Sequence, residues 1–408
     1  MVLGEGEVTA PLLVEALRKQ EYGVVIENLE LADLESSVVP RFDLLDLDAY
    51  VDLTIQFSRG CPYRCEFCDV TLMFGRRVRT KKPAAVLREL ETLYAMGWRR
   101  QIHFVDDNFV GSPLKAKAFL VELQQWMEAH GRPFQFYTYS SVLLGSFPDL
   151  LELLPAAGFI MVMLGIESTD KQTLKGAGKI HNTAVDLDEA VRRINRAGLQ
   201  IMALTMIGFD QEPPGADTRI IDFATRNSIH EVGISLLQAF PGTRLWNRLK
   251  REGRLLESED SNLGDWHNLE MNFAPSRHPL EIMQEFVQVH KVLYDPARYL
   301  ERVYRHFANM KPESKAEGGP RFTMPNLYEI RALLVTLVRQ GLVLPSRAAF
   351  WRFFFKAIRN LSQKRFTLFV RECIKMEHYL ERVQKLRSAL LNRTIQDQSA
   401  ATLKDPAA

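Results

Sequence analysis

Three of the four cysteines in this 408-residue chain lie within eight residues of sequence and could together hold a metal centre. Cys61, Cys65 and Cys68 form a C-x3-C-x2-C pattern, whereas Cys373 lies far downstream. Clustered cysteines in a chain that has so few are more often metal ligands or redox groups than disulfides. Three thiolates in one tight loop can bind three corners of an iron–sulfur cubane, which usually takes four cysteines. We therefore expect a [4Fe–4S] cluster with one iron open to an outside ligand.

A structural zinc ion is the main alternative for this loop, and a chance grouping of buried thiols is another. Zinc prefers four ligands, usually as two pairs of spaced residues. The sequence offers no second Cys or His pair at a suitable distance, and His103 falls in a predicted strand, where we expect a core histidine. The pattern therefore favours the iron–sulfur cluster.

Strand and helix patterns alternate six times after residue 51, and the cysteines follow the first strand. The predicted strands are 53–57, 101–105, 135–139, 160–164, 201–207 and 231–237. Helical patterns lie between them at 83–96, 113–129, 148–157, 183–197 and 217–228, with another after Gly242. Alternation of this kind predicts a parallel sheet covered by helices, with strands that are apolar because both faces are buried.

Polar side chains follow the predicted strands where each strand ends. They are Asp106, Asp107, Asn108, Ser140, Ser141, Glu167, Ser168, Asp210 and Gln238. Ligands of parallel sheets and barrels bind at the carboxyl ends of the strands, so this set predicts a binding site at one rim. Helix capping is the alternative for Asp106 and Asp107. An unpaired buried carboxylate is costly, so Glu167 must reach a ligand, a partner or water, or act as a cap.

The cysteine loop and its place in the six-fold alternation resemble the radical S-adenosylmethionine superfamily over about residues 52–254. The resemblance implies an α/β fold, a partial (βα)6 TIM-like barrel whose cluster binds and cleaves S-adenosylmethionine to give a 5′-deoxyadenosyl radical. Phe67 resembles the aromatic residue that packs on adenine, and Glu167 resembles a ribose-binding residue. Asp106, Asp107 and Asn108 stand where the superfamily has its methionine-binding motif, and Pro241 and Gly242 resemble part of the adenine pocket. Ser140 is a further candidate for cofactor binding.

Several segments resemble the cobalamin-associated branch of that superfamily. They are Gly4–Glu7, Pro40–Asp43, Gln56–Gly60, Val105–Phe109 and the helical C-terminal region. The resemblance implies that residues 1–50 are the end of a cobalamin-binding domain plus a linker. The pattern predicts an amphipathic helix over about residues 9–19 and an irregular connection over residues 28–50. The chain has no Asp-x-His-x-x-Gly signature of such a domain, so we expect either a truncated form or a separate cobalamin-binding subunit.

The rest of the chain is expected to form a barrel over residues 51–275, a helical domain over 276–395 with a break near 311–319, and a disordered tail over 396–408. The helical region resembles hopanoid C-2 methylases and their relatives. This implies cobalamin-dependent methyl transfer, or a related C–H functionalisation, on a lipid-like or other small molecule. A flavodoxin or ferredoxin is expected as the reductant.

Two other functions stay open. Arg76, Arg77, Arg79, Lys81 and Lys82 form a basic cluster near the cysteines that could meet RNA phosphates, as in an RNA-modifying methyl- or methylthiotransferase. The net charge of only +2 and the lack of a β-rich RNA-binding module make nucleic acid a weaker candidate. A non-catalytic iron–sulfur remnant of a longer enzyme is the other alternative.

The segment Trp351–Lys356, with Arg347 and Arg359, mixes large aromatic residues with cations. It could touch a membrane surface, or it could be a core helix with one basic face. No run of 18 apolar residues is free of charge, and the N-terminus lacks a signal-peptide pattern. We therefore expect a cytoplasmic protein, with contact at the inner face of a membrane as an open alternative.

Overall fold

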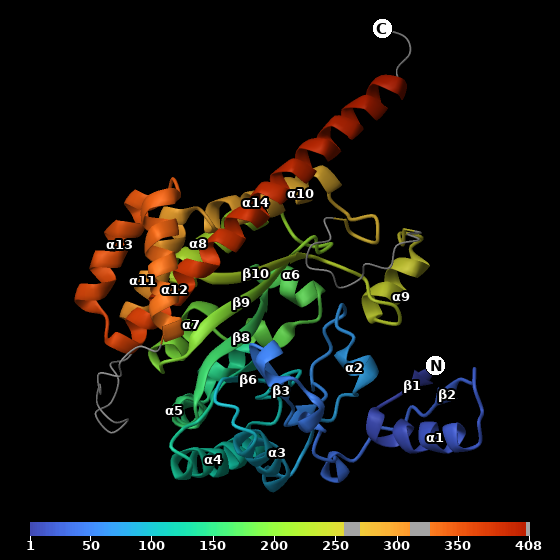
Figure 1. The fold of residues 1–408 in the computed structure, drawn as a ribbon. Coiled ribbons are helices and arrows are strands. Elements are labelled where there is room, and N and C mark those ends of the chain that lie inside the picture. Colours follow the sequence, from blue (N-terminus) through green and yellow to red (C-terminus); the bar gives the residue numbers. More distant parts are fainter. Residues whose placement is uncertain (257–269, 311–326, 405–408) are drawn as a thin grey trace. The chain divides into compact units, whose positions relative to one another are not determined.

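The computed structural model describes residues 1–256, 270–310 and 327–404 (Figure 1). The chain divides into two compact units. The first consists of Met1–Gly165 and Phe240–Leu245, and the second of Ile166–Ala239 and Trp246–Ala408. The cysteine loop belongs to the first unit, and the C-terminal helices belong to the second.

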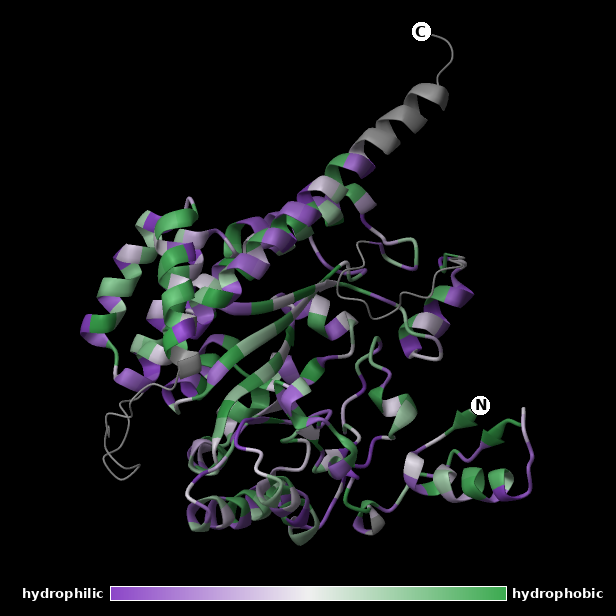
Figure 2. Ribbon diagram, viewed as in Figure 1, coloured by the Kyte–Doolittle hydropathy of each residue, from purple (hydrophilic) through white to green (hydrophobic). Residues whose placement is uncertain are grey.

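A six-stranded sheet forms the framework, in the order β10-β9-β8-β7-β6-β3. Its strands are β3 (Asp52–Ile55), β6 (Gln101–Phe104), β7 (Gln135–Ser140), β8 (Phe159–Glu167), β9 (Gln200–Ile207) and β10 (Glu231–Leu236). The pairs β3–β6, β6–β7, β7–β8 and β9–β10 are parallel. All six predicted strands are confirmed, and Figure 2 shows that much of their length is hydrophobic.

The helices that follow the strands are also close to their predicted bounds. They are α3 (Pro83–Ala95), α4 (Pro113–Ala129), α5 (Pro148–Ala156), α7 (Leu187–Arg196), α8 (Ala216–Arg226) and α9 (Arg244–Arg251). The predicted helix at 183–197 begins later because Asp186 caps α7, its side chain accepting from the Glu189 backbone N–H at 3.0 Å. A 3₁₀ turn, Ile180–Ala184, and the short helix α6 (Lys171–Gly176) precede it.

A core of aromatic side chains in the first unit packs around the segments near Phe57 and Phe109, which lead into the candidate site. Phe57 stacks on Phe119 with 4.4 Å between ring centroids, and Phe109 lies 5.1 Å from Phe159. Phe104 packs against Phe119 and Phe159, and all five rings are almost fully buried. Aromatic pairs of this kind add about 0.5–1.5 kcal/mol each beyond their buried area. The core therefore anchors the chain directly before Ser58 and directly after Asn108.

The N-terminal segment forms a small β–α–β unit, whose helix was predicted and whose two short strands were not. β1 (Val2–Leu3) pairs in parallel with β2 (Ile26–Glu27), and α1 (Gly6–Arg18) connects them. Three 3₁₀ turns follow, at Leu34–Ser36, Phe42–Leu44 and Leu47–Ala49. The irregular connection expected over residues 28–50 is thus present. A second small sheet pairs β4 (Ser58–Arg59) with β5 (Arg79–Thr80), and α2 (Val70–Met73) lies between them in sequence.

The second unit ends in helices, as predicted. They are α10 (Pro279–Leu293), α11 (Pro296–Asn309), α12 (Leu327–Val338), the π-helical turn η7 (Arg339–Val343), α13 (Arg347–Asn360) and α14 (Gln363–Lys404). The predicted break at 311–319 lies outside the described residues. The expectation of a disordered tail from residue 396 is wrong up to Lys404, because α14 continues that far. Residues 396–404 contain good helix formers and no proline, so the backbone has no local reason to stop earlier.

Candidate iron–sulfur and S-adenosylmethionine site

The three cysteines lie in a loop between β4 and α2. The loop closes on itself, since the backbone N–H of Cys68 donates to the Cys65 carbonyl oxygen and that of Cys61 donates to the Gly75 carbonyl oxygen, each at 3.4 Å. All three thiols are partly buried. This local folding places three sulfur ligands within one short stretch of chain, as the spacing predicts.

Without a metal centre, the environment of Cys68 in the loop favours the neutral thiol over the thiolate. Burial raises the pKa of Cys68 to about 12, and negative charge on Cys65, Asp69 and Cys61 contributes to this rise. A structural zinc ion would need a fourth ligand beside the three thiolates. The remaining cysteine, Cys373, is buried in α14 of the second unit. A set of three thiolates therefore fits a cluster that leaves one iron open to an outside ligand.

Asp106 follows the end of β6, as predicted, and its carboxylate binds groups of the chain itself. It is fully buried and accepts from the backbone N–H groups of Phe57 at 2.9 Å and Ser58 at 2.7 Å, and from the Ser58 hydroxyl at 2.5 Å. Burial raises its pKa to about 7. Both carboxylate oxygens are therefore engaged in holding the chain between β3 and β4. The helix-cap alternative is wrong, since Ser112 is the N-cap residue of α4.

Asp107 and Asn108 each accept a hydrogen bond from a backbone N–H group. Asp107 accepts from the backbone N–H of Gly60 at 2.8 Å and so positions the residue before Cys61. The side-chain oxygen of Asn108 accepts from the Ser141 backbone N–H at 3.1 Å. The Asn108 side-chain N–H₂ and the Ser141 hydroxyl are buried without hydrogen-bond partners. Orphaned donors in a buried position suit an anionic group such as the carboxylate of S-adenosylmethionine.

The segment before α9 lies against the cysteine loop although it is distant in sequence. The Leu245 backbone N–H donates to the Glu66 carbonyl oxygen at 2.8 Å, and the Arg244 guanidinium donates to the Arg64 carbonyl oxygen at 3.2 Å. The candidates Pro241 and Gly242 are therefore held near the loop that contains the half-buried Phe67. The Ser140 hydroxyl instead donates to the Ser141 carbonyl oxygen at 3.1 Å, which gives it a local partner.

Glu167 belongs to the second unit and is almost buried. Its carboxylate lies 2.5 Å from the ammonium of Lys179, a residue that sequence reasoning missed. The backbone of Glu167 has a φ of +60°, a conformation that non-glycine residues seldom adopt outside functional or strained sites. Lys179 supplies the partner that a buried carboxylate requires, and no spacing in the sequence indicates that pairing.

A network around Arg59 and Arg79 was also missed. Glu7 binds the Arg59 guanidinium through two hydrogen bonds of 2.8 Å, and this pairing lowers the pKa of Glu7 to about 2. The Arg59 Nε also donates to Gln56 at 2.6 Å. Glu5 pairs with Arg79 and accepts from the Ala32 backbone N–H. The Gly-Glu-Gly-Glu segment thus fixes Arg59, two residues before Cys61.

The basic cluster near the cysteines is mostly neutralised. Arg79 pairs with Glu5, Lys81 lies 2.5 Å from Glu89, and Lys82 lies 2.7 Å from Glu35. Paired cations offer little to a phosphate backbone. The RNA interpretation therefore loses most of the charge on which it rested.

The other strand-end residues are engaged in the second unit. Asp210 binds Arg248 and Arg254, whose hydrogen bonds outweigh the effect of burial and hold its pKa well below the usual range. The side-chain amide of Gln238 donates to the Glu270 carbonyl oxygen at 2.7 Å. Glu212, which was not predicted, accepts from the Gly208 backbone N–H at 2.8 Å, and burial raises its pKa to about 7.

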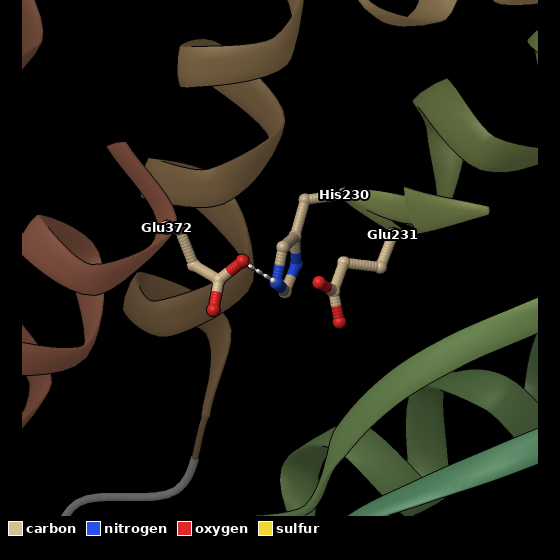
Figure 3. A group of neighbouring side chains, drawn as sticks. All are labelled: His230, Glu231 and Glu372. Atoms are coloured by element: carbon tan, nitrogen blue, oxygen red, sulfur yellow. Dashed lines mark ion pairs between the residues drawn. The ribbon is translucent and has the colours of Figure 1, made fainter. Parts of the chain in front are cut away.

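A second group of potential metal ligands lies at the opposite, amino-terminal end of β10. Figure 3 shows His230, Glu231 and Glu372 with both carboxylates directed towards the imidazole. The ammonium of Lys375 lies 2.5 Å from Glu231 and 3.0 Å from Glu372, so this buried cluster already contains a cation. We interpret it as an internal ion-pair network that fastens α14 to β10.

A parallel sheet of six strands, with a three-cysteine loop near the carboxyl end of its first strand, defines a class of iron–sulfur enzymes built on a partial barrel. A model of the radical SAM superfamily matches residues 55–224, and a model of a domain of unknown function, DUF4070, matches residues 243–391. The chain is 41% identical over 419 residues to the uncharacterized methyltransferase sll1242 of Synechocystis sp., covering 100% of this chain and 76% of that protein. The chain belongs to the radical S-adenosylmethionine superfamily.

Two further relatives have a named activity or cofactor. The hopanoid C-2 methylase of Rhodopseudomonas palustris is 35% identical over 237 residues, which are 58% of this chain and 45% of that enzyme. The structure of OxsB, a cobalamin-dependent S-adenosylmethionine radical enzyme with aqua-cobalamin and S-adenosylmethionine bound, aligns with a TM-score of 0.55 at 17% identity. That alignment covers 96% of this chain and 64% of OxsB, and it supports the fold.

Proposed function

We propose that the protein is a radical methyltransferase that adds a methyl group to an unactivated carbon of a lipid-like molecule, with cobalamin as the methyl carrier. The observation that carries the proposal is the cysteine loop with the unpartnered Asn108 and Ser141 donors in the same unit. The names of the methyltransferase relatives favour methyl transfer, and the hopanoid methylase favours a lipid-like substrate.

Each residue of the site has a distinct proposed role. Cys61, Cys65 and Cys68 would bind the cluster, which when reduced supplies the electron that cleaves S-adenosylmethionine. Asn108 and Ser141 would donate to the carboxylate of that molecule, since both donors are buried without partners. An unactivated C–H bond cannot be deprotonated near neutral pH, so radical chemistry is the route that such a substrate requires.

Asp107, Phe67 and the segment at Pro241 and Gly242 would complete the part of the cofactor site that lies in the first unit. Asp107 positions the loop through Gly60, while Phe67 and Pro241–Gly242 lie in segments that are hydrogen-bonded to each other and could enclose an adenine. Glu167 would accept from the ribose hydroxyls while Lys179 balances its charge. A flavodoxin or ferredoxin is the proposed electron donor.

The cobalamin would be held by a domain outside residues 1–408, on the same polypeptide or on a partner. The β1–α1–β2 unit supports this idea because two parallel strands with one helix do not bury a core of their own. Its large apolar residues are exposed, among them Val2, Leu3, Leu12, Leu17 and Val25. A neighbouring domain would cover this apolar surface.

The test is anaerobic turnover of the reconstituted protein with methyl-deuterated S-adenosylmethionine, a reduced flavodoxin or ferredoxin as electron donor, a hopanoid lipid in detergent and added cobalamin. We expect 5′-deoxyadenosine, and we expect labelled methyl on the lipid only when cobalamin is supplied with its domain. Cys65→Ala should abolish both products. Formation of 5′-deoxyadenosine without any methylated lipid would sink the methyltransferase proposal. An iron content near zero with zinc in its place would sink the cluster itself.

A further inference from the structure

Residues 330–371 form a stretch of 42 residues without a single Asp or Glu. It contains nine cations: Arg331, Arg339, Arg347, Arg352, Lys356, Arg359, Lys364, Arg365 and Arg371. The whole chain has 52 basic and 50 acidic residues, so the imbalance is local. A basic stretch of this kind indicates an anionic partner rather than a merely solvated face.

The same stretch exposes large apolar side chains. They are Ile330, Leu334, Val335, Val338, Leu342, Val343, Phe355 and Ile358. Leu342 and Val343 are 65% and 67% exposed, and Phe355 and Ile358 are 53% and 54% exposed. Single exposed apolar residues need no explanation, but a group of them usually marks an interaction site.

Side-chain contacts join the turn η7 to the outer face of α13. The Trp351 indole N–H donates to the Gly341 carbonyl oxygen at 2.9 Å, and the Trp351 ring stacks on Phe355 with 5.4 Å between centroids. Leu342 and Val343 follow Gly341 directly. Ile358 lies one turn after Phe355 and therefore on the same face of α13.

The opposite face of α13 belongs to the core. Phe350, Phe353, Phe354 and Ala357 are buried. The core-helix alternative for this segment thus holds for one face of α13, whereas the other face presents Phe355, Ile358 and the cations. Figure 2 shows hydrophobic and hydrophilic residues alternating along α13. We define the basic apolar surface as the exposed residues Leu342, Val343, Phe355 and Ile358, the half-buried Trp351, and the cations Arg347, Arg352, Lys356 and Arg359.

We propose that the basic apolar surface docks the protein on an anionic lipid bilayer. Cations attract anionic headgroups, and aromatic and aliphatic side chains between them enter the boundary between headgroups and acyl chains. Among the described residues, the structure contains no helix with the length and hydropathy of a membrane span. The inference rests on the proposed function only in that a lipid-like substrate would be found there.

Nucleic acid is the other anionic partner that a basic surface could bind. Phosphate recognition uses cations and polar groups, and it gives no role to exposed aliphatic residues such as Leu342, Val343 and Ile358. Transfer of these side chains out of water lowers the free energy, and a bilayer provides an apolar region that can receive them. The combination therefore favours lipid over nucleic acid.

Flotation of the full-length, cluster-loaded protein with vesicles tests the proposal. We expect binding to phosphatidylcholine vesicles that contain phosphatidylglycerol, little binding to pure phosphatidylcholine, and weaker binding as salt rises. Phe355→Ser should lower the partition coefficient at least about fivefold, because it removes an inserted ring. Leu391→Ser, at a 61% exposed position of α14, is the matched control and should bind as the wild type does.

A charge-reversal pair tests the electrostatic part. Arg352→Glu with Arg359→Glu should abolish the preference for anionic vesicles, whereas Lys385→Glu on α14 should retain it. Phe353→Ser is unsuitable because Phe353 is buried and its loss would disturb the fold. Equal flotation of wild type and Phe355→Ser would overturn the proposal. Binding to an RNA oligonucleotide that exceeds vesicle binding, and that Phe355→Ser leaves unchanged, would overturn it too.

Failure of docking and failure of the proposed function can be told apart. Vesicle binding is measured without S-adenosylmethionine, and methyl transfer is measured on lipid dispersed in detergent. Phe355→Ser should lose flotation while retaining turnover on the dispersed lipid. Intact flotation without methyl transfer would refute the proposed function and leave the docking surface standing.

Discussion

Replacing Gly60 with alanine tests whether close packing fixes the backbone just before Cys61. Gly60 has a φ of +91°, and an added Cβ would lie 2.9 Å from the Arg77 carbonyl oxygen and 3.1 Å from those of Phe74 and Gly75. A left-handed backbone costs an L-residue about 1–2 kcal/mol. The three carbonyl oxygens belong to the backbone and cannot rotate aside, so the clash adds to that cost.

Gly97→Ala is the matched control. Gly97 follows α3 and has a φ of +86°, and a Cβ added there would meet no atom within 4 Å, so it shares the conformational cost without the clash. One kcal/mol shifts Tm by about 2–4 °C in a unit of 150–250 residues. We therefore expect Gly97→Ala to lower Tm by about 2–8 °C. Gly60→Ala should lower it by at least twice the value measured for the control.

Iron content is the decisive measurement for this pair. Movement of Gly60 would lengthen its 2.8 Å hydrogen bond to Asp107 and the 3.4 Å bond between Cys61 and Gly75. After anaerobic reconstitution we expect about four irons per chain in Gly97→Ala, as in the wild type, and less than half of that in Gly60→Ala. Equal iron in the two variants would refute the reasoning.

Three further substitutions probe charged groups. Glu7→Gln breaks the pairing with Arg59 and should speed iron loss at neutral pH. In the wild type, the stabilisation from the Glu7 carboxylate is present above pH 4.5 and is lost as the pH falls towards 2, which thermal unfolding at acidic pH should show. Burial raises the pKa of Glu212 from 4.5 to about 7, so ionisation of this group lowers the stability of the fold as the pH rises through that range. Glu212→Gln should therefore flatten the dependence of Tm on pH between pH 5 and 8, and identical profiles of wild type and variant would contradict this. Lys375→Met leaves two buried carboxylates without their cation, so its Tm loss should be large at pH 8 and smaller at pH 6.

The sheet and most helices could be predicted because their signals are local. Apolar strands buried on both faces and amphipathic helices repeat along the chain, and each can be recognised within a short window. β1 and β2 were missed because two-residue strands have no periodicity to detect. The end of α14 was misplaced because small polar residues are compatible with both helix and coil.

The partners inside the site could not be predicted, since they depend on register between distant segments. Asp106 was correctly placed at a strand end, but its bonds to Phe57 and Ser58 follow from the pairing of β3 with β6. The pairing of Glu167 with Lys179 likewise needs the turn after β8. A carboxylate at a strand end is therefore a site signal, but the sequence does not say whether it faces ligand or backbone.

Asp106 and Asp107, which the sequence offered as ligands, act together with Glu7 to hold the chain that leads into the cysteine loop. Asp106 holds Phe57 and Ser58, Glu7 holds Arg59, and Asp107 holds Gly60. Every residue of the stretch that leads into Cys61 is thus tied to a carboxylate. These hydrogen bonds order the stretch during folding, so cluster binding does not have to offset the conformational entropy that is lost when it becomes ordered. We therefore infer that the cysteine loop is preorganised, so that the cluster binds to a loop that is already ordered.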